Sequence, residues 1–149
     1  MNFKEKIYLH YKELLAEKIK QLQQVLQDLH YSASNETKST AGDKHETALA
    51  MLQIEQQNKR NQLSELLKQD ALLDKINPAV IAPYVLNGSL IQTDKGYFFI
   101  STALGKIVID GKTVFALSPS SPLGKQLMGL KINGQAKVNE SIYNILSVK

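Results

Sequence analysis

Large apolar side chains recur at alternating spacings of four and three residues along the first part of the chain. After Phe3, Ile7 and Tyr11, they continue at Leu15, Ile19, Leu22, Leu26 and Leu29. This is the spacing of the apolar seam of a coiled coil. Because no Gly or Pro interrupts residues 3–30, we predict one long helix there, with an apolar stripe that a second helix must cover.

A polar stretch from Tyr31 to Thr47 separates this pattern from a second one. Thr40 and Asp43 each stand three residues before an acid, the arrangement of a helix N-terminal capping box, so a second helix is predicted from near one of them to about Lys75. Its apolar seam is interrupted, since every residue between Ile54 and Leu63 is polar. The polar stretch is therefore expected to form the tip of an antiparallel helical hairpin.

The dipeptide Asn77-Pro78 ends the second helix, because proline disfavours helical geometry in the residue before it. Beyond it, the hydrophobic pattern changes from a helical period to the period of two that is typical of strands. We therefore expect a coiled-coil domain over residues 1–76, a linker over 77–84 and a β-rich domain over 85–149.

The C-terminal part contains two predicted β-hairpins, at residues 86–101 and 106–117, the second with an Asp-Gly turn. Ser121 and Pro122 are suited to the cap and first position of a short helix, which is predicted over residues 123–128. A last strand is expected at 141–148. The fold class is α+β, a helical hairpin followed by an antiparallel sheet with one short helix.

Composition and charge limit the function. The chain has no Cys, which excludes disulfides, zinc-thiolate sites and thiol nucleophiles. Neither a membrane span nor a signal peptide is expected, and a cytoplasmic protein is predicted. The net charge of +4 resides in the second half, since residues 1–75 carry 11 basic and 11 acidic side chains and residues 76–149 carry 7 and 3. Without an Arg cluster, this charge is a weak signal for nucleic acid, and no direct sequence-specific binding of nucleic acid is expected.

Three carboxylates lie near the hairpin tip: Glu36, Asp43 and Glu46. Helix capping and solvation explain each one alone, but Glu36 and Asp43 could also supply oxygen ligands to Mg²⁺ at a site on another molecule. A transition-metal site that uses His45 and His30 is the weaker interpretation, since it needs more ligands on a rigid frame. No nucleophile motif, phosphate loop or site for a small-molecule substrate is evident. We expect neither an enzyme nor a cofactor of its own.

The segment Ser121-Pro-Leu-Gly-Lys-Gln-Leu-Met-Gly-Leu-Lys131, placed before the last two strands, resembles the Gre family of bacterial transcript-cleavage and elongation factors. The resemblance implies an FKBP-like C-terminal domain that docks on RNA polymerase, and a coiled coil that enters the polymerase's secondary channel. It makes these residues docking candidates: Ser121, Pro122, Lys125, Leu127, Met128, Gly129 and Lys131. Tip carboxylates of that family help to hold a Mg²⁺ ion shared with the polymerase.

The tip departs from the family pattern. When the motif is aligned on Ser39, Thr37 and Thr40 stand at positions where the family has acids, and Asp43 alone matches a later acid. We therefore expect a transcription elongation regulator that binds RNA polymerase with weak or absent stimulation of transcript cleavage. The alternatives are a coiled-coil interaction or oligomerisation module without a polymerase link, and an FKBP-like prolyl isomerase, which would need a proline pocket lined by aromatic rings.

Overall fold

The structure is a computed structural model that describes residues 1–36 and 42–149, without the side chains of residues 36–45. It divides into two compact units. One, here called the sheet unit, contains Met1–Glu13 and Ala71–Lys149; the other, the hairpin unit, contains Leu14–Asp70. The linker expected at residues 77–84 thus falls inside the sheet unit. Separate folding of residues 85–149 stays a prediction.

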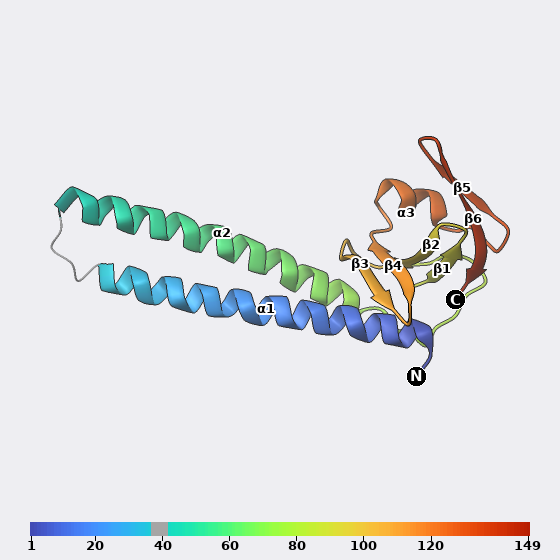
Figure 1. Cartoon of the computed structure of the whole chain (residues 1–149), viewed down its shortest axis with the longest axis horizontal. Coiled ribbons are helices and arrows are strands. Elements are labelled where there is room, and N and C mark those ends of the chain that lie inside the picture. Colours follow the sequence, from blue (N-terminus) through green and yellow to red (C-terminus); the bar gives the residue numbers. More distant parts are fainter. Residues whose placement is uncertain (37–41) are drawn as a thin grey trace. The chain divides into compact units, whose positions relative to one another are not determined.

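Two long helices, α1 over Phe3–Glu36 and α2 over Gly42–Asp74, come first in the chain (Figure 1). Asn2 caps α1, because its Oδ1 accepts a hydrogen bond from the Glu5 backbone N–H at 2.9 Å. The structure corrects the expected end of α1 from residue 30 to Glu36. No Gly or Pro stands in between to end the helix.

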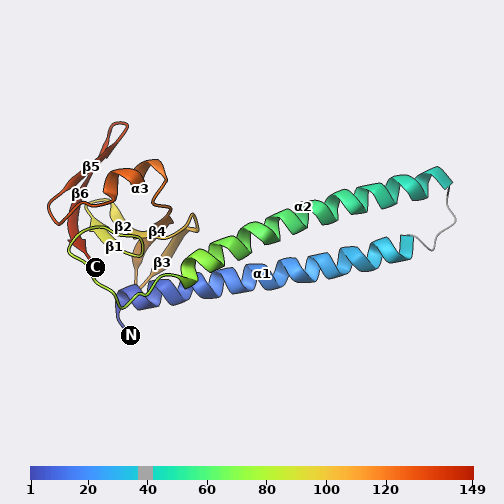
Figure 2. The same cartoon turned by 180° about the vertical axis from the view of Figure 1, so that it is seen from behind.

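In the hairpin unit, the antiparallel helices face each other along the predicted seam (Figure 2). Leu15 and Leu22 of α1 are buried. On α2 the inward positions keep alternating spacings of three and four through the polar stretch: Leu49, Leu52, Gln56, Lys59, Leu63 and Leu66. The predicted interruption is therefore corrected. The seam is continuous in register, with Gln56 only 7% exposed and Ile54 62% exposed.

The sheet unit contains six strands, β1 to β6: Leu90–Thr93, Gly96–Ile100, Gly105–Ile109, Lys112–Leu117, Gln135–Val138 and Ser141–Val148. Their order is β3-β4-β2-β1-β6-β5. All neighbours are antiparallel except β2 and β4, which pair in parallel with Tyr97 opposite Val114. The expectation of a purely antiparallel sheet is thus corrected to a mixed one. The β3–β4 hairpin folds back so that β4, and not β3, lies beside β2.

Both faces of this sheet carry buried side chains. On one face, Leu127 of the short helix α3 (Pro122–Leu127) packs in a cluster with Phe98, Ile100 and Ile145. On the other face, the ring of Tyr11 from α1 stacks on Phe99. The start of α1 therefore belongs to the core of the sheet unit, which explains why that unit includes residues from both ends of the sequence.

No helix in the described part of the chain is both long and apolar enough to cross a membrane.

Candidate docking surface

The start of α3 is built by the residues that carry the Gre resemblance. Ser121 caps the helix: its Oγ accepts a hydrogen bond from the Gly124 N–H at 3.1 Å and donates one to the Ser118 carbonyl at 2.7 Å. Pro122 occupies the first helical turn. A Cβ atom on Gly124 would lie 2.0 Å from the Ser118 carbonyl oxygen, so only glycine is accommodated there. The predicted cap is confirmed.

The residues after α3 are held by a short extended segment from another part of the chain. Gly129, at φ +81°, donates its N–H to the Val85 carbonyl at 2.9 Å. The Val85 N–H in turn donates to the Leu130 carbonyl at 2.9 Å. Tyr84 and Lys131 then form an antiparallel bridge. The position of Lys131 is therefore fixed by backbone pairing with the residues that precede β1.

Burial separates the docking candidates into two groups. Leu127 is fully buried in the sheet core, so its expected place on a docking surface is wrong: a six-residue helix against a sheet points this side chain inward. Met128 is half-buried and packs against the same core. Lys125 and Lys131 are exposed, and these two ammonium groups remain as the candidates able to contact a partner.

Sequence reasoning missed the apolar side chains beside Lys131. Tyr84 is 42% exposed, Leu86 37% and Ile132 57%. Ile132 is adjacent in the sequence and could have been noticed, whereas the pairing that brings Tyr84 to Lys131 has no local signal. An exposed aromatic and aliphatic group beside a basic side chain has the composition of the inner part of many protein interfaces.

The charges of the sheet unit leave this surface positive. Two of its acids are engaged elsewhere: Asp110 pairs with Lys6 at 3.1 Å, and Asp94 accepts bonds from the Asn144 N–H at 2.8 Å and from its Nδ2 at 3.0 Å. The Asn144 bonds hold the pKa of Asp94 below its usual value. Within the part of the chain that is described, neither Lys125 nor Lys131 forms an ion pair.

The second candidate region is the hairpin tip, where the structure places little. Thr37, Ser39 and Thr40 lie outside the described residues, as do the side chains of Glu36 and Asp43. The carboxylate of Glu46 is exposed on the first turns of α2. Among the described residues, no three His, Asp or Glu side chains gather to hold a metal ion, and the interpretation that uses His45 falls outside that set.

Comparison with known proteins gives a likeness of fold. No family model matches the chain, and no curated protein matches it in sequence. Among solved structures, the GreA factor homolog 1 (Gfh1) of Thermus thermophilus is 14% identical, with coverage of 93% of this chain and 94% of that chain and a TM-score of 0.36. A second structure, of the transcription factor Gfh1, is 13% identical over 92% of both chains, with a TM-score of 0.37. At these values the likeness carries no functional argument.

Proposed function

We propose that this chain is a Gre-like regulator of transcription that binds RNA polymerase through its sheet unit. The docking surface consists of Lys125 on α3, Lys131 and the exposed side chains of Tyr84, Leu86 and Ile132. The coiled-coil tip enters the polymerase's secondary channel. The protein acts in the cytoplasm, and it has no catalytic site of its own.

The observation that carries this proposal is the division of labour within the segment that resembles the Gre family. Ser121, Pro122 and Gly124 build the helix, and Leu127 anchors it in the core. The rigid frame that results presents Lys125 and Lys131 to solvent. Two fixed cations beside apolar side chains suit a partner with an acidic surface that also carries an apolar patch.

The docking test is a binding titration of the full chain against purified bacterial RNA polymerase. The double variant Lys125→Glu/Lys131→Glu is expected to weaken binding at least about tenfold, because it reverses two charges at the contact. Its melting temperature should stay nearly unchanged, since both side chains are exposed. The matched control is Lys75→Glu/Lys106→Glu, which changes the charge equally at exposed positions elsewhere in the sheet unit.

Each outcome of this titration decides between readings. Wild-type protein that fails to bind polymerase would overturn the proposed function. Equal weakening by both double variants would indicate attraction by net charge alone. Weakening by the control pair only would move the docking surface to another part of the sheet unit.

Transcript cleavage is proposed to be weak or absent. Thr37 and Thr40 offer neutral hydroxyl groups where the resemblance implies acids, and neutral hydroxyls are poorer Mg²⁺ ligands than carboxylates. The test is a backtracked elongation complex incubated with the protein and Mg²⁺. Little shortening of the RNA 3′ end is expected. Strong shortening that Glu36→Ala or Asp43→Ala abolishes would show that these carboxylates supply the shared Mg²⁺ ligands after all.

A second candidate function is a coiled-coil module that pairs with another copy. It is favoured by Met51 and Ile54, which are 66% and 62% exposed and, three residues apart on α2, lie on one helix face. Analytical ultracentrifugation of the wild-type chain and of Met51→Glu/Ile54→Glu distinguishes the two. A dimer that the substitutions dissociate, together with no binding to polymerase, would favour this candidate over the first.

A further inference from the structure

A hollow of about 510 Å³ lies in the sheet unit, away from α3. Its walls come from the start of α1, the segment after α2, and strands β1, β2, β4 and β6. The size lies within the range of roughly 300–1,000 Å³ that is usual for small-molecule sites. Neither the Gre resemblance nor the proposed docking surface uses it.

Strand register places a row of side chains on the floor of this hollow. Gln92 on β1 is opposite Tyr97 on β2 and opposite Ser147 on β6, so the three side chains share one face of the sheet. Lys112 on β4 lies on the same face, since it stands two residues before Val114, the partner of Tyr97. This is also the face that Tyr11 covers at Phe99. The hollow is therefore part of that face that α1 leaves open.

The apolar part of the wall contains two aromatic rings. Phe3 and Tyr97 meet edge to face, with ring centroids 5.2 Å apart and planes at 73°. Leu90, Ile81 and Pro78 continue this wall. A flat, largely apolar group can be packed against such a surface, because ring edges and aliphatic side chains offer close contact without a competing polar group.

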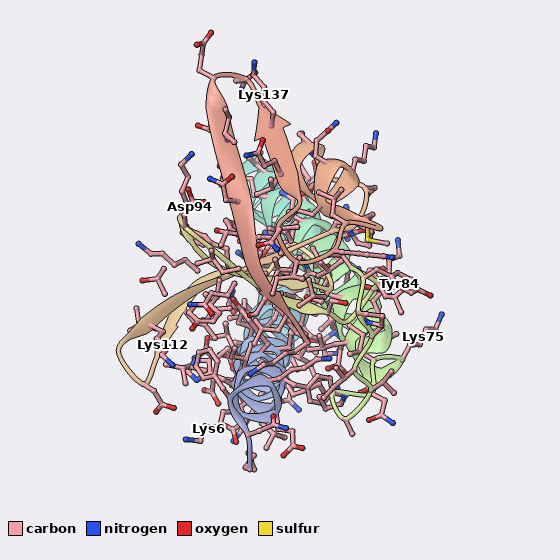
Figure 3. All side chains as sticks on the ribbon, turned by 90° about the vertical axis from the view of Figure 1, so that its right-hand side faces the viewer. Lys6, Lys75, Tyr84, Asp94, Lys112 and Lys137 are labelled. Atoms are coloured by element: carbon pink, nitrogen blue, oxygen red, sulfur yellow. The ribbon has the colours of Figure 1, made fainter. Side chains whose placement is uncertain are left out.

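The charge of the lining is entirely positive. Its side chains include Lys4, Lys112 and Lys149, and among the described residues that line it there is no Asp or Glu. The ammonium group of Lys4 is held by the Val80 carbonyl at 2.7 Å. Lys112 is the freer cation: its Nζ lies 4.8 Å from the Phe3 ring centroid and 5.7 Å from that of Tyr97. Figure 3 shows Lys112 at the β3–β4 hairpin beside the start of α1, which carries Lys6. The nearby carboxylate of Asp110 pairs with Lys6 instead.

One amide group is available for recognition. Ser147 donates its hydroxyl to Oε1 of Gln92 at 3.5 Å, which orients the amide. Within the described part of the chain, no acceptor takes the NH₂ donors of Gln92. The other lining amide, Asn2, is occupied by the cap of α1, where it contacts Glu5. Gln92 is thus the group that can bond to the polar edge of a ligand.

We propose that this hollow binds a nucleoside phosphate. Lys112 contacts the phosphate at the mouth, Phe3 and Tyr97 pack against the base, and the amide of Gln92 bonds to an acceptor on the base edge. A nucleotide is the class of small ligand that joins an anionic group, a flat ring and hydrogen-bonding ring edges in one molecule, matching the three kinds of group in the lining.

The test is a titration of the full, ¹⁵N-labelled chain by NMR with AMP, GMP, CMP and UMP. Inorganic phosphate and adenosine are the partial probes. At least one nucleotide should shift the Gln92 side-chain amide signals together with the backbone signals of Tyr97 and Lys112, and should bind at least about tenfold more tightly than either partial probe. No polymerase is present, so the result is independent of the proposed function.

Two variants locate the contacts. Lys112→Met keeps an apolar stem but removes the charge, and should weaken nucleotide binding about tenfold, the value of one charge-assisted hydrogen bond. Lys106→Met, an exposed lysine on β3 outside the lining, is the matched control and should change nothing. Gln92→Leu should lower affinity for the nucleotide and leave the affinity for inorganic phosphate unchanged.

Three results would overturn the proposal. The first is no shift at millimolar nucleotide. The second is inorganic phosphate binding as tightly as every nucleotide, which would leave an anion site without recognition of a base. The third is equal binding by the wild type, Lys112→Met and Gln92→Leu, which would place the ligand elsewhere.

Discussion

The ring of Tyr11 on α1 stacks on Phe99 of β2, with centroids 6.2 Å apart and planes at 14°. The Tyr11 hydroxyl also donates a hydrogen bond to the Gly105 carbonyl at 2.8 Å, where β3 begins. Both rings are fully buried. One side chain from the first turns of the chain therefore fills the core and satisfies the backbone of a sheet that begins almost eighty residues later.

Tyr11→Ala is expected to destabilise the sheet unit by roughly 3–5 kcal/mol, the usual cost of removing a buried aromatic ring. Urea denaturation followed by the near-ultraviolet signal of the tyrosines measures it. The control is Tyr31→Ala, on the same helix but 68% exposed, for which a change within about 0.5 kcal/mol is expected. Equal effects of the two substitutions would contradict a core role for Tyr11.

Stability at alkaline pH should depend on the Tyr11 hydroxyl. Burial raises the pKa of Tyr11 well above its ordinary value, whereas in the unfolded chain it ionises near pH 10. Above that pH the unfolded state binds fewer protons than the folded state, so stability falls as pH rises. Tyr11→Phe removes this contribution, at a cost near neutral pH of about 1 kcal/mol for the lost hydrogen bond.

The measurement compares the two proteins in urea between pH 8 and pH 11. The difference between wild type and Tyr11→Phe should shrink as pH rises past about 10. A constant difference over the whole range would mean that the hydroxyl is not shielded from water in the folded state.

Asp94 should have the opposite dependence, at acidic pH. Its bonds from the backbone N–H and side chain of Asn144 lower its pKa in the folded state. The stability that they contribute is present above the unfolded pKa of about 3.9 and is lost as pH falls through the lower folded value. Asp94→Asn should therefore destabilise the sheet unit at pH 7 and have less effect near pH 2.

Thermal denaturation at the two pH values tests this. Glu140→Gln, which removes an exposed carboxylate in the turn before β6, is the control and should show no such change with pH. An effect of Asp94→Asn that is equal at both pH values would assign the role of this residue to turn geometry instead of charge.

Local patterns accounted for the elements but not for their pairing. Ser121, Pro122 and the Asp110-Gly111 turn act over a few residues, and the structure has the α3 cap and the β3–β4 hairpin where the sequence placed them. The parallel pairing of β2 with β4 depends on which strand occupies the place beside β2. Neither candidate strand differs from the other in period, so the pattern contained no information about that choice.

The candidate site shows the same limit. The exposure of Lys125 and Lys131 follows from their charge, but the burial of Leu127 depends on the direction in which a short helix meets the sheet. The neighbourhood of Tyr84 and Lys131 comes from a bridge between residues far apart in the sequence. The role of Tyr11 in the sheet core was missed for that reason too, since its spacing fitted the helical seam equally well.

Gln56 occupies an inward position of the hairpin seam, between Leu52 and Lys59 in register, and is only 7% exposed. A leucine there would bury apolar surface in place of an amide, and Gln56→Leu is expected to stabilise the hairpin unit by about 1 kcal/mol. Gln57→Leu, one residue further and exposed, should give no gain. Helical circular dichroism during urea denaturation measures both, and ultracentrifugation checks that neither variant gains stability by self-association. If Gln56→Leu destabilises the hairpin, then the amide has a specific role in fixing the register of the two helices, as single polar residues at seam positions do in coiled coils.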